Sequence, residues 1–175
     1  KSPRECTSIV VAPQDLKYRV LLIHKDKDEL RNSNILKYIE RGEKQGFHER
    51  PTCASRKRWY DLGKWYPFEV LFTMYFQQSY KYHLNPFRCF VDHTMYECDS
   101  GNTNLNKILI LFFNSSMAFL YPDILGRGYG GGGAPTGFMV YEVERLPVID
   151  LLKISPANRK KLLQLFKKFT RRKWG

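Results

Sequence analysis

The stretches EVLFTMYFQQSYKY, residues 69–82, and NLNKILILFFNSSMAFL, residues 104–120, decide the fold class. The first is rich in aromatic and β-branched residues and predicts a strand that ends before Pro86. The second is apolar on most faces and predicts a buried helix, with Asn102 or Asn104 as its N-cap. Because strands and helices are mixed here without a regular βαβ alternation, the sequence favours the α+β class.

Further elements are predicted on both sides of this pair. Before the pair, the sequence predicts a buried strand over residues 18–24, a helix over 35–41 and a loop over 50–63; Asn34 would cap the helix, and Gly42 or Gly46 would end it. After residue 82 it predicts a strand over 90–96, a loop over 126–137 and a strand over 137–148 that Pro147 ends. The last predicted element is a helix over 156–173, with Ser155 as N-cap and Pro156 at N1. The expected architecture is a mixed sheet with a buried helix and a basic C-terminal helical segment, residues 151–175.

Length and charge set the limits on function. The chain has 175 residues, enough for a single domain, and its formal net charge of +12 favours a polyanionic partner. No apolar run is long enough to span a bilayer, so we expect no membrane partner. Four cysteines without a CxxC pair predict reduced thiols and a cytoplasmic location. The chain starts without Met or a signal peptide, so we expect it to be part of a longer protein.

The basic segment over residues 50–66 carries the most functional information. It interleaves Arg50, Arg56, Lys57 and Arg58 with aromatic side chains that include Trp59 and Tyr60. Guanidinium groups bind phosphates or guanine edges, which favours polyanion binding for the cationic set. The two aromatic residues either stack beside a ligand or anchor the loop to the core.

A second basic element lies at the C-terminal end. Residues 151–175 contain nine Lys or Arg and neither Asp nor Glu, with leucine and phenylalanine supplying an apolar side. The helix either docks by that side and leaves a solvated basic face, or grips DNA phosphates through residues such as Lys167 and Lys168.

The glycine-rich stretch over residues 126–137 matches GxGxxG at Gly126, Gly128 and Gly131. A dinucleotide site needs a strand before this motif and a helix after it, and the predicted order here is the reverse. The alternatives are a flexible linker or a loop that approaches a polymer backbone, with Arg127 and Tyr129 as contacts.

Metal and hydrolytic chemistry have weaker support. The histidines and cysteines lack the spacing of zinc ligands, so no metal site is predicted. Asp92, Glu97 and Asp99 form a cluster of acids, but the Asp/Glu-x-Lys arrangement of a metal-dependent nuclease is missing. A small nuclease therefore stays a minor alternative.

Four motifs in this order resemble a known family. They are YIERGE (38–43), RPTCASRKRWYDL (50–62), NSS (114–116) and YEVERLPV (141–148), the last preceded by the glycine-rich stretch. From about residue 20 to 150 the chain resembles the C-terminal target-recognition domain of N6-adenine DNA methyltransferases of restriction–modification systems. Specificity subunits of type I systems have related domains, which leaves a noncatalytic specificity or protein-interaction module as an alternative.

The resemblance implies a division of labour. The N/D-P-P-Y/F motif that holds a flipped adenine is absent, since Asn85-Pro86 is followed by Phe87 and Arg88. An upstream domain of the parent enzyme would therefore bind S-adenosylmethionine and transfer the methyl group, while this fragment holds double-stranded DNA without a cofactor or catalytic residue. The predicted DNA contacts are Arg50, Thr52, Ser55, Arg56, Lys57, Arg58, Trp59, Tyr60, Arg127, Tyr129, Lys167 and Lys168.

Overall fold

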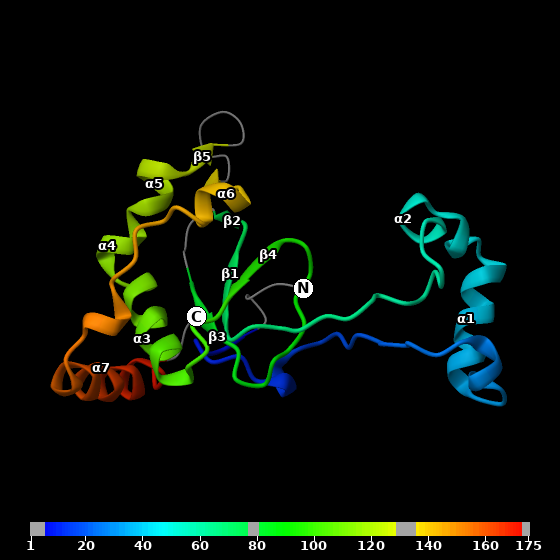
Figure 1. The fold of residues 1–175 in the computed structure, drawn as a ribbon, viewed down its shortest axis with the longest axis horizontal. Coiled ribbons are helices and arrows are strands. Elements are labelled where there is room, and N and C mark those ends of the chain that lie inside the picture. The colour runs from blue at the N-terminus through cyan, green and yellow to red at the C-terminus, as the bar shows by residue number, and fades with distance from the viewer. Residues whose placement is uncertain (1–5, 77–80, 129–135, 173–175) are drawn as a thin grey trace. The chain divides into compact units, whose positions relative to one another are not determined.

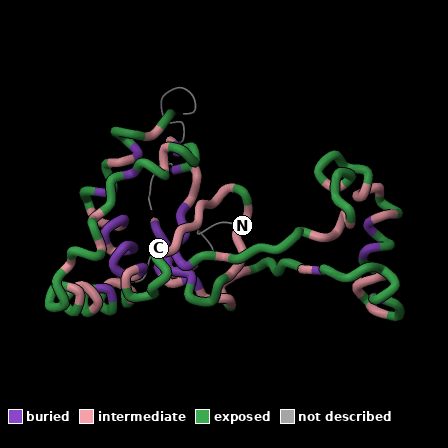
Figure 2. The backbone as a smooth tube through the Cα atoms, viewed as in Figure 1, coloured by how far each residue is buried: buried purple, intermediate pink, exposed green. Residues whose placement is uncertain are grey.

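The computed structural model describes residues 6–76, 81–128 and 136–172 (Figure 1). The chain divides into two compact units where length alone predicted one domain. Unit 1 comprises Lys1–Tyr18 and Pro67–Gly175, and unit 2 comprises Arg19–Tyr66, inserted between the two segments of unit 1. Each unit has its own cluster of buried apolar side chains. Figure 2 marks buried residues in both units in purple.

Unit 1 contains two small antiparallel sheets. The first has the order β3-β1-β4, with strands His83–Leu84, Val70–Thr73 and Met95–Cys98. The second has the order β2-β6-β5, with strands Tyr75–Phe76, Thr136–Gly137 and Arg127–Gly128. Val10 adds an isolated parallel bridge to Leu84. The predicted α+β class is confirmed.

Met74 divides the strand that was predicted over residues 69–82. Its backbone N–H donates to Thr94 O at 2.8 Å on the side of β4, while its carbonyl accepts from Phe138 N at 3.2 Å next to β6. The chain therefore leaves the first sheet as β1 and enters the second as β2. The strand predicted over 90–96 is also shorter at its start, since β4 begins at Met95.

The long apolar helix is broken by its own polar residues. Helix α3, Thr103–Phe113, is capped by Asn102, whose side chain accepts from the N–H groups of two residues in the first turn. Asn114 ends it and donates to the carbonyls of Tyr82 and Ile110. Ser115 then caps α4, Ser116–Phe119, and α5 follows at Tyr121–Leu125. The predicted single helix to residue 120 is thus two helices separated by Asn114 and Ser115, the first two residues of the NSS motif.

Aromatic packing dominates the core of unit 1. The rings of Tyr82 and Phe113 stack at 4.5 Å, and Phe72 lies 5.0 Å from the ring of Tyr82. Helix α7, Pro156–Phe169, buries Phe166 in the same cluster, after the short 3-10 turn at Leu151–Lys153. Ser155 caps α7 and Pro156 occupies its first turn, as predicted.

Two predicted strands are wrong. Residues 18–24 are extended but pair with no strand, and Tyr18, Val20 and Leu21 are exposed. Residues 137–148 contain helix α6, Val140–Val143, because the Glu142 carboxylate accepts from Met139 N and caps a helical turn. The glycine-rich stretch, predicted as a loop, forms β5 and β6 at its described ends.

Unit 2 is built from short helices around a small core. Its elements are the 3-10 turns Lys27–Leu30 and Phe47–Glu49 and the helices α1, Asn34–Lys44, and α2, Pro51–Ala54. Ser33, and not the predicted Asn34, caps α1. Gly46 follows the helix with φ at 71°, the left-handed conformation that glycine adopts without strain. Ile23, Leu30 and Ile39 are buried.

Among the described residues, no single helix has the length and apolar character to cross a bilayer, although α3 together with residues 116–125, bent by 60°, passes on length and composition alone. Most apolar side chains of α3 lie in the core of unit 1.

Candidate nucleic-acid interface

The basic segment of unit 2 begins at α2. Arg50 is the N-cap residue of this helix, and its guanidinium lies 4.3 Å from the centroid of the Phe47 ring. Arg50, Thr52 and Ser55 are all exposed. Sequence reasoning treated residues 50–63 as a loop, but Pro51 at N1 starts a short helix that turns the chain toward the basic residues.

Arg58 is held by two carboxylates. Its guanidinium donates to Asp61 Oδ2 at 2.7 and 3.1 Å and to Asp26 Oδ1 at 3.2 Å. These hydrogen bonds raise the pKa of Arg58. Because Asp26 lies before α1 and Asp61 lies after α2, within the basic segment, Arg58 joins the first part of unit 2 to its last part.

Asp61 is the centre of this contact, which we call the Asp61 clamp (His24, Asp26, Arg58, Asp61 and Gly63). Its carboxylate accepts from Gly63 N at 2.8 Å and lies 2.9 Å from His24 Nδ1. The Gly63 amide, His24 and Arg58 lower the pKa of Asp61 to about 2. The Asp61 carboxylate is therefore charged across the neutral pH range.

Trp59 packs into a space that only glycine leaves open. A Cβ atom at Gly42 would lie 2.5 Å from Trp59 Cη2, closer than real contacts allow. The indole N–H donates to Glu43 Oε1 at 3.0 Å. Burial opposes ionisation of Glu43, but the hydrogen bonds from Lys27 and Trp59 outweigh it and lower its pKa.

Tyr60 completes the anchor of the basic segment. Its hydroxyl donates to Lys25 O at 3.0 Å, and its ring meets that of Trp59 edge-on at 6.0 Å. Both rings pack on the small core of unit 2. Two of the four motifs therefore pack against each other in unit 2. YIERGE supplies Ile39, Gly42 and Glu43, and RPTCASRKRWYDL supplies Trp59, which packs on them.

Arg56 and Lys57 differ from Arg58, Trp59 and Tyr60, which are held by hydrogen bonds. Both are exposed, and neither has a salt bridge within residues 6–76, 81–128 and 136–172. Residues 19–66 hold twelve Lys or Arg against seven Asp or Glu, and several of those acids already pair with Lys27, Arg31 or Arg58. The exposed cations without an ion pair in this unit include Arg41, Lys44, Arg50, Arg56, Lys57 and Lys64.

Of the predicted contacts in the glycine-rich stretch, only Arg127 is described. Its guanidinium pairs with Glu142 Oε1 at 2.6 Å and with the Tyr141 hydroxyl, and these groups raise its pKa. Arg127 therefore ties β5 to α6. Tyr129 and Gly131 lie outside the described residues.

The predicted contacts on α7 lie on a solvated helix. Lys167 and Lys168 are exposed and have no ion pair in the described parts of the chain. Arg159 has a structural role instead, because it donates to the backbone carbonyls of Leu151, Leu152 and Ile154 and holds the preceding turn against the helix. The structure does not bring Lys167 and Lys168 into the same unit as Arg56 and Lys57.

The acidic cluster considered for a nuclease is engaged in structural contacts. Asp92 accepts from the Thr94 amide, Glu97 accepts from Phe68 N, and Asp99 pairs with Arg88 at 2.6 Å. No group of three potential metal ligands occurs among the described residues. These carboxylates order the loops on either side of β4.

Sequence reasoning missed a buried polar network. Glu69 and Asn106, 6% and 0% exposed, are joined by a 2.8 Å hydrogen bond, and Asn106 also donates to Asp99. Thr103 and Arg88 complete the set at Glu69. An asparagine in the apolar sequence of α3 is the signal that could have revealed it, because a buried amide requires partners.

No curated protein and no solved structure matches this chain. A family model does, and it is described as the C-terminal domain of the Type II methyltransferase M.Eco57I; it covers residues 10–173, which include unit 2, most of unit 1 and all four motifs. The chain therefore belongs to the family of C-terminal domains of Type II methyltransferases.

Proposed function

We propose that this chain recognises duplex DNA for an adenine-specific methyltransferase of a restriction–modification system, and that unit 2 provides the main contact surface. The observation that carries the proposal is the contrast within one short segment. Arg56 and Lys57 are exposed and have no ion pair in the described part of the chain, while the next three residues are fixed by hydrogen bonds.

This arrangement suits nucleic-acid binding for a physical reason. A cationic loop that is already ordered loses less conformational entropy on binding than a mobile one. Arg58, Trp59 and Tyr60 then act as positioning residues, and Arg56 and Lys57 contact phosphates or base edges. Lys167 and Lys168 of α7 provide further phosphate contacts.

Methyl transfer belongs to another domain of the parent enzyme in this proposal. That domain would bind S-adenosylmethionine and the flipped adenine. In the described part of the glycine-rich stretch, Gly126 follows helix α5 and Gly128 lies in strand β5, the reverse of the strand–glycine–helix order of a nucleotide site. A Cβ at Gly126 would also lie 2.4 Å from Pro122 O, so this glycine serves close packing.

The test is binding of the 175-residue chain to duplex DNA at several salt concentrations. With about 4 to 8 phosphate contacts, we expect a log–log salt slope of roughly −4 to −7. Arg56→Ala plus Lys57→Ala should weaken binding and make the slope less negative by about 1 to 2. A slope near zero for the wild-type chain would refute DNA binding.

Lys37→Ala plus Arg41→Ala is the matched control, because it removes the same charge from exposed positions of the same unit that have no ion pair among the described residues. This control should change affinity much less than the loop variant. Equal losses would mean that only the net charge of unit 2 matters. In the full-length enzyme, loss of Arg56 should cost about 1–3 kcal/mol of site discrimination if it reads a guanine.

The division of labour has its own test. The isolated chain, incubated with duplex DNA and radiolabelled S-adenosylmethionine, should incorporate no methyl group, whereas the full-length enzyme should. Methylation by the isolated chain would place catalysis within these residues and overturn the proposal.

A further inference from the structure

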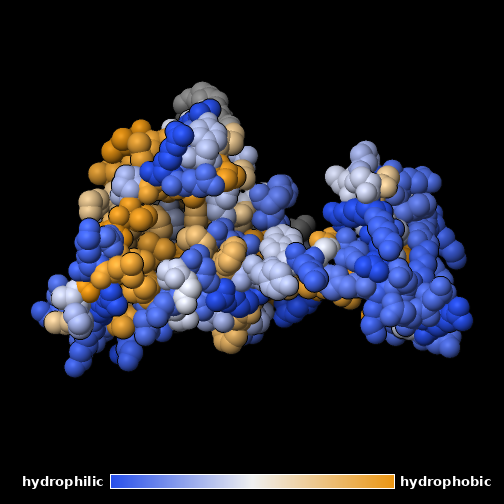
Figure 3. All heavy atoms as spheres, in the orientation of Figure 1, coloured by the Kyte–Doolittle hydropathy of each residue, from blue (hydrophilic) through white to orange (hydrophobic). Residues whose placement is uncertain are grey.

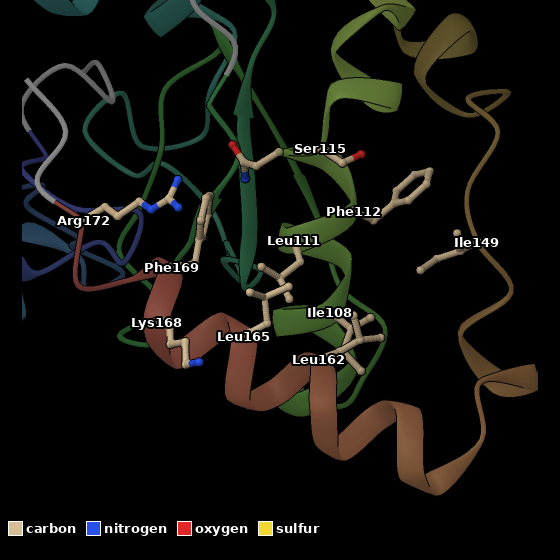
Figure 4. Close-up of a pocket in the computed structure, with 11 residues that line it drawn as sticks. Ile108, Leu111, Phe112, Ser115, Ile149, Leu162, Leu165, Lys168, Phe169 and Arg172 are labelled. Carbon is tan, nitrogen blue, oxygen red and sulfur yellow. The ribbon is translucent and has the colours of Figure 1, made fainter.

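An apolar groove runs between α3 and α7 in unit 1 (Figure 4). Its volume is about 530 Å³. The walls include Ile108 and Leu111 from α3 and Leu162, Leu165 and Phe169 from α7. Leu165 is 52% exposed, although it lies beside the core, so apolar surface in the groove faces solvent. Figure 3 shows hydrophobic side chains gathered over the helices of unit 1.

This surface does not suit a nucleic-acid backbone. Phosphates need polar or charged partners, and protein–DNA interfaces are more polar than protein–protein interfaces. Contiguous exposed apolar surface on a folded protein instead marks a site of protein contact. The groove therefore has a different use from the cationic loop of unit 2.

The rim of the groove is basic. Lys168 and Arg172 line it and have no ion pair among the described residues, and α3 contributes Lys107 nearby in its sequence. Neither α3 nor residues 151–172 contain an Asp or Glu. A ligand with acidic groups beside its apolar ones would gain charge pairing here, and a basic ligand would be repelled.

The secondary structure of the groove walls favours a helical ligand over an extended one. The two main walls are helices, whose backbone groups are already hydrogen-bonded along most of their length, so neither wall offers a strand edge to an extended peptide. Ile149 adds a contact from the segment that precedes the 3-10 turn. An extended peptide would bury unsatisfied N–H and C=O groups against apolar side chains. A helix brings its own hydrogen bonds, and helix-in-groove binding is an established mode of recognition.

The geometry points to a docking site for an acidic amphipathic helix of a protein partner, seated between α3 and α7 with its apolar face on Leu165 and its acids at Lys168 and Arg172. This goes beyond DNA recognition and uses a surface in the other unit. Of the two lysines of α7 proposed above as phosphate contacts, Lys168 lies at the rim of this groove and Lys167 does not line it, so Lys167 is the one that separates DNA binding from peptide binding.

The probe is a fluorescent synthetic peptide of about 18 residues, roughly 27 Å as a helix, with leucine along one face and glutamate on its flanks. Titration with the 175-residue chain should give a dissociation constant of about 10 µM by anisotropy. A scrambled peptide of equal composition tests for attraction to the net charge alone and should bind at least about tenfold more weakly.

Three variants locate the site. Leu165→Glu should weaken binding about tenfold or more, and so should Lys168→Glu with Arg172→Glu, whereas Lys167→Glu should change it less than about twofold. Because these four side chains are exposed or half-exposed, thermal melting should show folded proteins. Methyl spectra of the wild-type chain should show shifts at Ile108 and not at Ile39 of unit 2.

The outcomes are decisive. No binding of the acidic peptide, equal binding of the scrambled peptide, or a loss of binding by Lys167→Glu equal to that of Lys168→Glu with Arg172→Glu would each overturn the docking site. Loss of DNA binding by Lys167→Glu with intact peptide binding would leave it standing, because Lys167 does not line the groove. Failure of DNA binding altogether would affect the proposed function only.

Discussion

Each of the two units is stabilised internally by a different kind of interaction. Unit 1 surrounds its sheets with a cluster of fourteen buried apolar residues, many of them aromatic. Unit 2 buries only Ile23, Leu30 and Ile39 and relies on the Asp61 clamp and on Trp59 for the rest. Charge screening by salt does not act on the apolar core of unit 1, whereas it weakens the ion pairs that fix the surface of unit 2 where a ligand would bind.

The largest effect should come from the core of unit 1. Phe72 is 2% exposed and contacts the rings of Tyr82, Tyr96 and Phe113. Phe72→Ala should lower the free energy of unfolding by about 3–5 kcal/mol, measured by urea denaturation. Amide exchange in α1 of unit 2 should stay unchanged if the two units unfold independently. Equal acceleration in α1 would show that the units unfold together.

The next effect is a pH dependence confined to unit 1. His83 is buried on β3, and burial, opposed in part by a hydrogen bond to Lys81, lowers its pKa to about 4. The folded state therefore binds a proton less readily than the unfolded chain, and stability falls as pH drops from about 6.5 to 4. The loss should approach about 3 kcal/mol.

His83→Leu removes the titrating group and is the control. The difference in unfolding free energy between wild type and variant should change by this amount between the two pH values. Parallel curves for the two proteins would mean that His83 contributes nothing to the acid sensitivity of unit 1.

In unit 2, Gly42→Ala sets two physical effects against each other. Alanine favours a helix interior by about 1 kcal/mol over glycine, but its Cβ would meet Trp59. We expect the clash to dominate, with a net loss of about 1–3 kcal/mol, read from amide exchange in α1. In a Trp59→Ala background, Gly42→Ala should no longer destabilise α1. If it still does, contact with Trp59 is not the cause of the lost stability.

The smallest effect should come from the clamp. Asp61→Asn keeps the size of the side chain and removes its charge, so amides at residues 58–63 should exchange faster while unit 1 is unaffected. In the wild type, the lowered pKa keeps this protection down to about pH 4, and it should be lost as pH falls toward 2. Wild-type and variant amides with equal protection at neutral pH would mean that the clamp does not order the loop.

Local sequence signals predicted the elements that depend on local contacts. The caps of α3 and α7 are set by Asn102 and Ser155, whose side chains bond within one turn. The strand over residues 18–24 was predicted from apolar composition, but a strand needs a partner that the local sequence does not report. The alternation over 137–148 failed similarly, because Glu142 caps a helical turn there.

The candidate site was predictable in composition and not in geometry. The sequence identifies a cluster of cations and aromatic residues. Which of them are held by the fold and which stay exposed depends on hydrogen-bond partners that lie far away in the sequence. Glu43 is 16 positions from Trp59, and Asp26 is 32 positions from Arg58. Only the Arg58–Asp61 pair, three positions apart, was visible locally. The predicted DNA contacts themselves stay predictions.

The insertion of unit 2 also has a consequence for biosynthesis. The backbone of Leu84 bonds to Ile9 and Val11, so these bonds cannot form until more than seventy further residues have left the ribosome. All of unit 2 emerges in that interval and has its own core. A nascent chain of this family would thus complete the inserted unit first, while the segment around Ile9 waits as exposed apolar peptide, a stage at which chaperones would bind.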